Sequence, residues 1–213
     1  MINKELQKRI FSSIILIPIA LFFIIKGSVF FIFFLGIFLL STIYEWHKMN
    51  KQYLLKFFGL IYLICVSSLA YLLRENFELN IFIFVIMICI FTDVGGYVFG
   101  KIFKGPKLTK ISPNKTYSGV FGSFFLSLMG GIFYLKYLSI SSLPMNETIK
   151  VSIIIFTISL ISQIGDLVIS YFKRKAKIKN TGKILPGHGG ILDRVDGIIF
   201  AIPASYLLFN FLN

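Results

Sequence analysis

Residues 149–175 read IKVSIIIFTISLISQIGDLVISYFKRK, an apolar stretch that ends in a basic cluster. A helix needs about 20 predominantly apolar residues to cross the hydrocarbon core of a bilayer. The run 149–172 meets this length, and Lys173 and Arg174 follow it directly. We therefore expect a transmembrane helix whose C-terminal end lies at the membrane surface, with one carboxylate, Asp166, inside its apolar part.

The composition of the whole chain agrees with a membrane protein. Of its 213 residues 56% are hydrophobic and 15% are charged, and the mean hydropathy is +0.84. Soluble domains have about 45–50% apolar and about 25% charged residues. The composition excludes a water-soluble globule and a disordered chain. Cys65 and Cys89 both lie in apolar runs, so a disulfide scaffold is excluded as well.

Seven apolar runs predict an all-α fold, a polytopic transmembrane helical bundle of about seven spans, because a helix satisfies its own backbone in lipid. The runs are 10–25, 28–44, 57–73, 79–100, 118–135, 149–172 and 197–212. We expect one integral membrane domain overall, with N-terminal spans in 1–90 and a catalytic region in 91–213.

The basic residues indicate the orientation of the chain. Segments 1–9, 45–56, 101–117 and 173–196 carry 18 of the 22 Lys and Arg residues. The positive-inside rule places these segments in the cytoplasm, where the loops 101–117 and 173–196 lie on one side of the membrane. The net charge of +13 is thereby explained by topology, and no nucleic-acid partner is expected. A cleaved signal peptide is not expected, because no small-residue cleavage pattern follows Lys26.

The acidic residues are scarce, and their positions suggest chemistry. Asp166, Ser170 and Lys173 fall on one helical stripe, which indicates a metal ligand or the wall of a polar site. The alternative is a structural ion pair between helices. Asp93 precedes the GxxxG spacing of Gly96 and Gly100, and either a site role or a helix–helix hydrogen bond fits it. All five Glu residues are assigned to the N-terminal tail or to loops near the ends of spans; they are Glu5, Glu45, Glu75, Glu78 and Glu147.

The first basic loop contains Ser112-Pro-Asn114-Lys115-Thr116 shortly before an apolar run. This turn would deliver a lysine, hydroxyls and an amide to a helix N-terminus, which suits a phosphate. The alternative is a solvated loop attracted to anionic lipid.

The second basic loop contains Pro-Gly-His-Gly-Gly at 186–190, followed by Asp193 and Asp196. The glycines let the backbone approach a ligand, and two Asp residues three apart share one helix face. Such carboxylates suit Mg²⁺. The alternative is an N-terminal capping pair with Arg194.

At these residues the sequence resembles the CDP-diacylglycerol synthase (phosphatidate cytidylyltransferase) family. The family's C-terminal signature is matched by Ser170, Phe172, Lys173-Arg174, Lys179, Pro186, His188-Gly189-Gly190, Asp193-Arg194 and Val195-Asp196. Upstream, Gly165-Asp166-Leu167, Thr92-Asp93 and the residues 111–116 are also similar. The resemblance covers roughly 90–200. Two departures remove a charge each: Asn180 stands where the family has Asp, and Ser118 where it usually has Glu.

The resemblance implies an enzyme, a nucleotidyltransferase that converts CTP and phosphatidate into CDP-diacylglycerol and pyrophosphate for phospholipid biosynthesis. The expected cofactor is Mg²⁺, and the family's site can use a second cation. We expect a homodimer in the cell inner membrane, multi-pass, with its site on the cytoplasmic side. Asp166, Asp193 and Lys173 are the expected catalytic residues, and Asp166, Asp193 and Asp196 the expected metal ligands. The expected substrate-binding residues are Ser112, Asn114, Lys115, Ser170, Arg174, His188, Gly189, Gly190 and Arg194.

Three other functions compete with this interpretation. Asp193-x-x-Asp196-Gly197 superficially resembles the motif of a CDP-alcohol phosphotransferase, but the residues expected after it are absent. An ion-coupled transporter would use Asp93 and Asp166 along its path. A non-catalytic lipid-binding subunit would have no activity with CTP.

Overall fold

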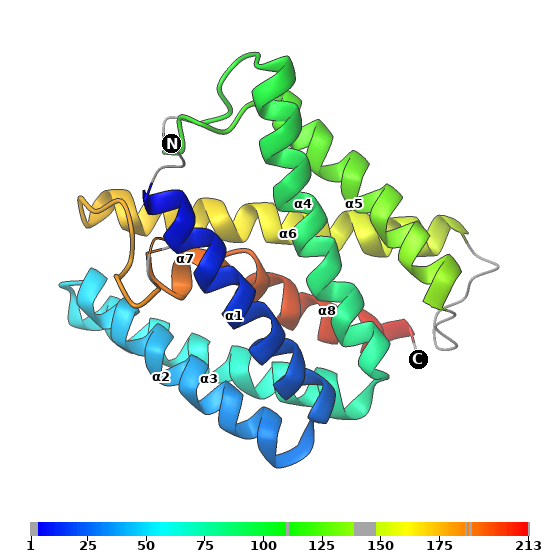
Figure 1. Ribbon diagram of the computed structural model, residues 1–213, viewed down its shortest axis with the longest axis horizontal. Helices are drawn as coiled ribbons and strands as arrows, with labels where there is room; N and C mark the ends of the chain where they lie inside the picture. The colour runs from blue at the N-terminus through cyan, green and yellow to red at the C-terminus, as the bar shows by residue number, and fades with distance from the viewer. Residues whose placement is uncertain (1–3, 110, 139–147, 186, 188, 213) are drawn as a thin grey trace. The chain divides into compact units, whose positions relative to one another are not determined.

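The computed structural model of the protein describes residues 4–109, 111–138, 148–185, 187 and 189–212. Figure 1 shows the eight helices formed by these residues: α1 (Lys4–Lys26), α2 (Ser28–Met49), α3 (Tyr53–Asn76), α4 (Leu79–Phe103), α5 (Tyr117–Leu138), α6 (Thr148–Lys175), α7 (Leu192–Val195) and α8 (Ile198–Leu212). Between the described residues, β-pairing is limited to two isolated bridges. The predicted all-α class is confirmed.

Each of the seven apolar runs corresponds to a helix. Five helices are long and apolar enough to cross a membrane, namely α2, α3, α4, α5 and α6. The apolar parts of α1 and α8, Phe11–Lys26 and Ile198–Phe211, are shorter. The prediction of a polytopic helical membrane protein is therefore confirmed, and α7 is a single additional turn between α6 and α8.

The chain folds as two compact units that interleave along the sequence. Unit 1 contains Met1–Tyr71 and Phe172–Val195, and unit 2 contains Leu72–Tyr171 and Asp196–Asn213. In this grouping the segment 172–195 folds with the N-terminal helices, and the expected division at residue 90 stays a prediction. Long-range packing of this kind leaves no local trace in composition.

Unit 1 is held together by aromatic side chains. Phe23 of α1 stacks on Phe34 of α2 with ring centroids 5.8 Å apart. Helices α2 and α3 lie side by side (Figure 1), and the Trp46 Nε1–H donates to the Leu55 carbonyl at 2.9 Å. This indole also contacts Phe172 near the end of α6, with ring centroids 5.0 Å apart. Trp46 thus fixes the start of the second basic loop against α2.

Unit 2 depends on small residues between α4 and α5. A Cβ at Gly95 would lie 2.8 Å from the Gly122 carbonyl carbon, and one at Gly96 would lie 2.8 Å from Ser123 Oγ. Because glycine has no side chain, the two backbones approach closely. The Ser123 hydroxyl also donates to the Thr92 carbonyl at 2.7 Å. A Cβ at Gly100 would lie 3.7 Å from the Gly119 Cα of α5, so both glycines of the GxxxG spacing, Gly96 and Gly100, serve packing between these helices.

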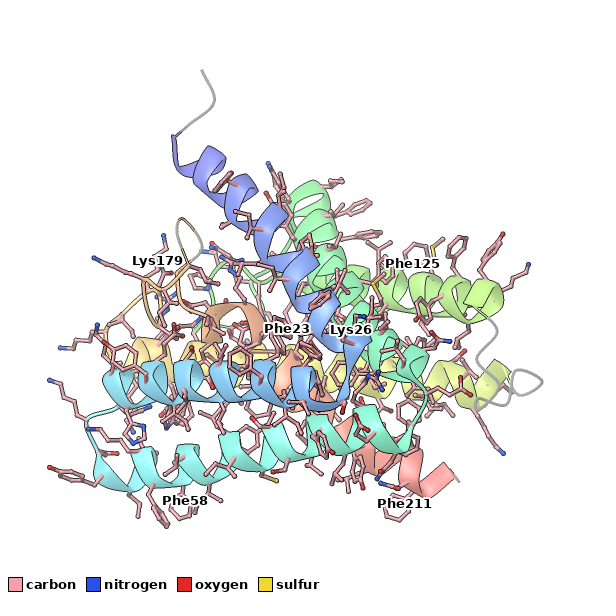
Figure 2. All side chains as sticks on the ribbon, turned by 60° about the horizontal axis from the view of Figure 1, so that its bottom comes forward. Phe23, Lys26, Phe58, Phe125, Lys179 and Phe211 are labelled. Carbon is pink, nitrogen blue, oxygen red and sulfur yellow. The ribbon has the colours of Figure 1, made fainter. Side chains whose placement is uncertain are left out.

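Much of the apolar surface faces outward. Figure 2 shows Phe58 of α3 and Phe211 of α8 pointing away from their own helices, and they are 59% and 88% exposed. Large exposed apolar surfaces are rare on soluble monomers. In a polytopic membrane protein these side chains contact lipid.

Candidate functional site

The second basic loop begins with a tight reversal at the end of α6. Lys177 adopts a positive φ of 58°, and the Ile178 N–H donates to the Lys173 carbonyl at 3.0 Å. A residue in the left-handed conformation often ends a helix, although glycine is the usual residue at this position. The loop later folds back on itself, since Leu185 and Gly189 exchange backbone hydrogen bonds of 2.9 and 3.2 Å. Gly189 has a φ of +94°, which suits the absence of a side chain.

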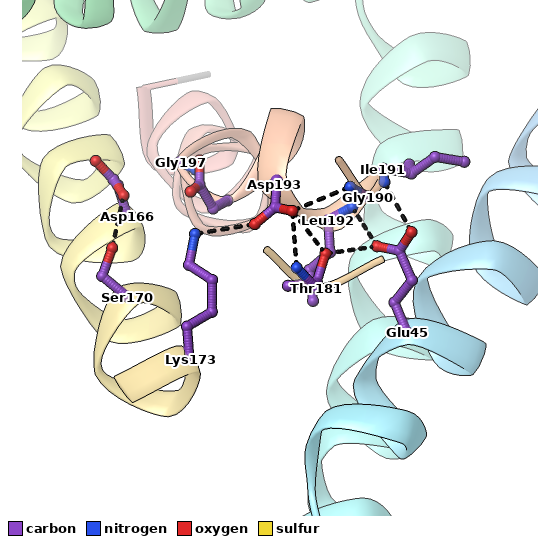
Figure 3. Close-up of polar contacts among 11 residues, drawn as sticks. Glu45, Asp166, Ser170, Lys173, Thr181, Gly190, Ile191, Leu192, Asp193 and Gly197 are labelled. Atoms are coloured by element: carbon purple, nitrogen blue, oxygen red, sulfur yellow. Dashed lines mark hydrogen bonds and ion pairs between the residues drawn. The ribbon is translucent and has the colours of Figure 1, made fainter. Parts of the chain in front are cut away.

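Asp193 is the centre of the polar contacts in this loop (Figure 3). Its Oδ2 accepts from the Thr181 N–H at 2.8 Å and the Gly190 N–H at 3.0 Å, and it lies 3.1 Å from the Thr181 hydroxyl oxygen. Its Oδ1 pairs with the Lys173 Nζ at 3.0 Å. The Asp193 side chain is only 7% exposed and that of Lys173 12%. The structure thus brings together four residues that the sequence separates by up to 20 positions.

A second carboxylate, Glu45, lies directly beside this cluster. Its Oε2 accepts from the Thr181 hydroxyl and from the Leu192 N–H, both at 2.8 Å, and its Oε1 accepts from the Ile191 N–H at 2.9 Å (Figure 3). The Glu45 residue is fully buried and belongs to α2. Its assignment to a loop near a span end is therefore wrong: α2 continues to Met49, and Glu45 accepts hydrogen bonds from a distant part of the chain.

Two glycines make room for the Glu45 carboxylate. A Cβ at Gly182 would lie 2.6 Å from Glu45 Oε1. A Cβ at Gly190 would overlap both Glu45 Oε2 and Thr181 Oγ1. The absence of a side chain at Gly182 and Gly190 is therefore explained by packing around Glu45, without any ligand.

In unit 2, Asp166 of α6 is held by the first basic loop. The Lys115 Nζ lies 2.7 Å from Asp166 Oδ2 and donates to the Gln163 carbonyl at 3.4 Å. The Ser170 hydroxyl donates to Asp166 Oδ1 at 3.2 Å, as the predicted helical stripe requires. The Asp166 and Lys115 side chains are 28% and 24% exposed, so both remain accessible to solvent. Lys115 and Asp166, which the sequence separates by 51 positions, form one cluster.

Two more aspartates belong to the surroundings of Asp166. The Asp93 carboxylate on α4 interacts electrostatically with both Asp166 and Lys115. A Cβ at Gly165 would lie 2.8 Å from the Asp196 carbonyl oxygen, so the backbone of Asp196 packs beside this part of α6. The Asp196 Oδ1 accepts from the Gly197 N–H at 3.1 Å.

The loop that carries Lys115 is folded by its own backbone. The Leu108 N–H donates to the Lys115 carbonyl at 2.8 Å, and the Lys115 N–H donates to the Ser112 carbonyl at 3.0 Å. Ser112 is half-buried in this turn, and Asn114 is exposed. The loop therefore presents Lys115 towards α6, while Asn114 faces outward.

The comparisons with known proteins cover nearly the whole chain. A model of the cytidylyltransferase family matches residues 50–212. A phosphatidate cytidylyltransferase of Rickettsia felis is 36% identical over 97% of this chain and 93% of its own length. A protein of the same name from Rickettsia bellii is 34% identical over 97% of this chain and 91% of its own length. The chain belongs to the cytidylyltransferase family.

A further member of the family, the phosphatidate cytidylyltransferase of Staphylococcus aureus, is 41% identical over 68% of this chain and 57% of its own length. The expected family resemblance is thus confirmed.

The two departures from the family pattern have structural partners here. The Ser118 hydroxyl donates to the Lys104 carbonyl, and the Ser118 and Thr116 hydroxyl oxygens are 3.0 Å apart, so the serine ties the two ends of the first basic loop together. Asn180 lies against Gly189: a Cβ on that glycine would lie 3.3 Å from the Asn180 Cβ. Both residues therefore shape the loops of this family member without a charge.

The remaining expected site residues have different outcomes. Arg174 and Arg194 are exposed, the first at the end of α6 and the second in α7. His188 lies outside the described residues. Glu45, Thr181 and Gln163 were missed from the sequence. The signal for Glu45 was its isolation, because no other acidic residue occurs between Glu5 and Glu75.

The carboxylates of the two clusters are oxygen donors of the kind that Mg²⁺ prefers. In the part of the chain that the structure describes, no group of three His, Cys, Asp or Glu residues has a metal-binding arrangement. Protein-bound Mg²⁺, however, usually needs only one or two carboxylates together with substrate phosphates and water. Asp166 and Asp193 each already contact a cation, the ammonium of Lys115 or Lys173. Their oxygen chemistry fits Mg²⁺, and the predicted ligand set stays a prediction.

Proposed function

We propose that this protein transfers the cytidylyl group of CTP to phosphatidate, which gives CDP-diacylglycerol and pyrophosphate. The observation that carries the proposal is the similarity to phosphatidate cytidylyltransferases along 97% of the chain. The alternatives of a CDP-alcohol phosphotransferase and of an ion-coupled transporter lack such support.

The reaction needs no nucleophile from the protein. A phosphatidate phosphate oxygen, already an anion, forms a bond with the α-phosphorus of CTP while the bond to the pyrophosphate oxygen breaks. The obstacle is the repulsion between two polyanions. Fixed positive groups lower this repulsion and stabilise the charge that develops on the departing pyrophosphate.

Two lysines are positioned for this task by carboxylates. Asp166 holds the Lys115 ammonium, and Asp193 holds that of Lys173. An ammonium that is already oriented loses less conformational freedom when a phosphate binds. We assign phosphate binding to Lys115, Lys173 and the exposed Arg174, with Ser112, Asn114, Ser170 and Arg194 as further substrate contacts. The loop 186–190, with His188, Gly189 and Gly190, is assigned to the nucleotide.

We assign Mg²⁺ to the carboxylates Asp166, Asp193 and Asp196, as the sequence predicts. When bound, the ion neutralises triphosphate charge and favours departure of pyrophosphate. Support comes from the hard oxygen donors, which Mg²⁺ prefers; to bind the ion, Asp166 and Asp193 would have to release or share the Lys115 and Lys173 ammonium groups.

We place the site on the cytoplasmic side of the cell inner membrane, where CTP is available. Support comes from the charge of the segments, since both loops that contribute basic residues belong to the positively charged set. A homodimer is part of the proposal as well, and the mass of the purified protein in detergent would test it.

The decisive experiment uses purified protein with phosphatidate micelles, radiolabelled CTP and Mg²⁺, followed by lipid extraction. Label in the lipid phase that depends on phosphatidate and on protein supports the proposal. Protein that is folded by size exclusion but yields no labelled lipid contradicts it. Parallel reactions without phosphatidate are the control.

A further inference from the structure

We propose that Glu45 is a positioning residue for the transfer reaction, which holds Thr181, Ile191 and Leu192 so that Asp193 and Lys173 keep their places. The inference deepens the proposed function and rests on it. Glu45 precedes the residues 50–212 that the family model matches. It therefore adds a residue from the N-terminal helices to a site otherwise built from the C-terminal half.

The first argument is burial. Glu45 has no exposed surface, and a buried carboxylate is very unfavourable unless hydrogen bonds satisfy it. Three donors do so, from Thr181, Ile191 and Leu192, at 2.8 to 2.9 Å. All of them lie on the second basic loop or at the start of α7. A carboxylate only accepts hydrogen bonds, so its oxygens specify where these donors must be.

The second argument is direct connection to Asp193. Two of the donors are the peptide N–H groups of Ile191 and Leu192, the two residues just before Asp193. The third is the Thr181 hydroxyl, which also lies 3.1 Å from Asp193 Oδ2. Glu45 therefore holds the backbone that carries Asp193 and the side chain that contacts it. Any shift of Glu45 is transmitted to both.

The third argument is the path onward to Lys173. Asp193 Oδ1 holds the Lys173 Nζ at 3.0 Å, and Lys173 is assigned to phosphate. The network thus runs from α2 through Thr181 and Asp193 to an ammonium group. A misplacement of about 1 Å in such a group lowers turnover by about 100-fold.

The test is the Glu45→Gln variant in the lipid-extraction assay. Glutamine has the same shape, but one of its two terminal groups donates, so at least one donor of the loop loses its acceptor. We expect kcat per folded molecule to fall by roughly 10- to 100-fold, while the KM for CTP changes by no more than about threefold. Glu75→Gln is the matched control, because Glu75 is an exposed glutamate near the end of α3. It should keep the kcat of the unmodified protein.

A second pair of variants covers the case in which Glu45→Gln does not fold. Thr181→Val removes the hydroxyl that joins Glu45 to Asp193 but keeps the side-chain shape, and it should lower kcat by about tenfold. Thr181→Ser restores the hydroxyl and should recover most of the lost turnover. A purely structural role would change the yield or thermal stability of the protein and leave kcat per folded molecule unchanged.

The outcomes separate this inference from the proposed function. If the unmodified protein makes no labelled lipid, the proposed function is wrong. If it is active and Glu45→Gln, or Thr181→Val where Glu45→Gln does not fold, keeps the kcat of the unmodified protein, the positioning role of Glu45 is wrong. A lowered kcat of Glu45→Gln supports the role. Where that variant does not fold, a lowered kcat of Thr181→Val together with a largely normal kcat of Thr181→Ser supports it.

Discussion

A methyl group at Gly190 should disable the second basic loop. The Cβ of Gly190→Ala would overlap Glu45 Oε2 and Thr181 Oγ1. Neither atom can swing aside freely, because each is hydrogen-bonded within the buried network. Overpacking of this kind destabilises the ordered loop by about 1–3 kcal/mol. Separating a charged acceptor from one of its donors costs a further contribution of about 1.5–3 kcal/mol. The ordered loop should therefore lose about 2.5–6 kcal/mol relative to its open forms.

This loss can be converted into activity. Because 1.4 kcal/mol corresponds to a factor of ten, the ordered fraction should fall by at least ~60-fold if the loop has little stability in reserve. The assay is CTP-dependent labelling of lipid, with circular dichroism to verify that the helices remain. Gly36→Ala in α2 is the matched control, since a Cβ there has nothing within 4 Å. Turnover of Gly190→Ala within about twofold of the Gly36→Ala control would refute the reasoning, because that is the range of a neutral surface change.

Three further predictions address other parts of the molecule. Asp166→Asn should abolish labelled product because it removes the charge that orients Lys115, and EDTA should stop the unmodified enzyme until Mg²⁺ is added back; a chelator-resistant rate would exclude the metal. Gly122→Ala should lower the thermal inactivation temperature in detergent, since its Cβ would lie 2.8 Å from the Gly95 carbonyl oxygen, which is overpacking worth about 1–3 kcal/mol; equal inactivation temperatures would argue against tight α4–α5 packing. Lys177→Gly should raise the inactivation temperature slightly, by relieving about 1 kcal/mol at a positive φ, and a decrease would show that the lysine side chain matters more.

The sequence predicts well what depends on local periodicity. The seven apolar runs became helices because hydropathy over about 20 residues decides membrane insertion. The stripe of Asp166 and Ser170 appears as a hydrogen bond because residues four apart share a helix face. Family membership followed from the spacing of residues 170–196.

What depends on distant contacts could not be predicted. Nothing in the sequence near Glu45 indicates that its carboxylate oxygens accept hydrogen bonds from residues 136 to 147 positions away. Asp193 was expected to face a metal. In the structure it accepts hydrogen bonds from Thr181 and Gly190, and nothing in the sequence around Asp193 indicates these donors. Thr181 resembles any hydroxyl in a basic loop until its position between two carboxylates is known.

The interleaved first unit has a consequence for synthesis. Glu45 leaves the ribosome long before Thr181 and Leu192, and at about 5–20 residues per second the delay is roughly 7 to 30 seconds. During this time its carboxylate lacks the donors of the finished protein and must stay hydrated or bound by an insertion factor. The N-terminal helices can therefore complete their folding only when the chain is almost fully made, so a prematurely terminated product would carry an exposed charge within its helices that quality-control proteases can recognise.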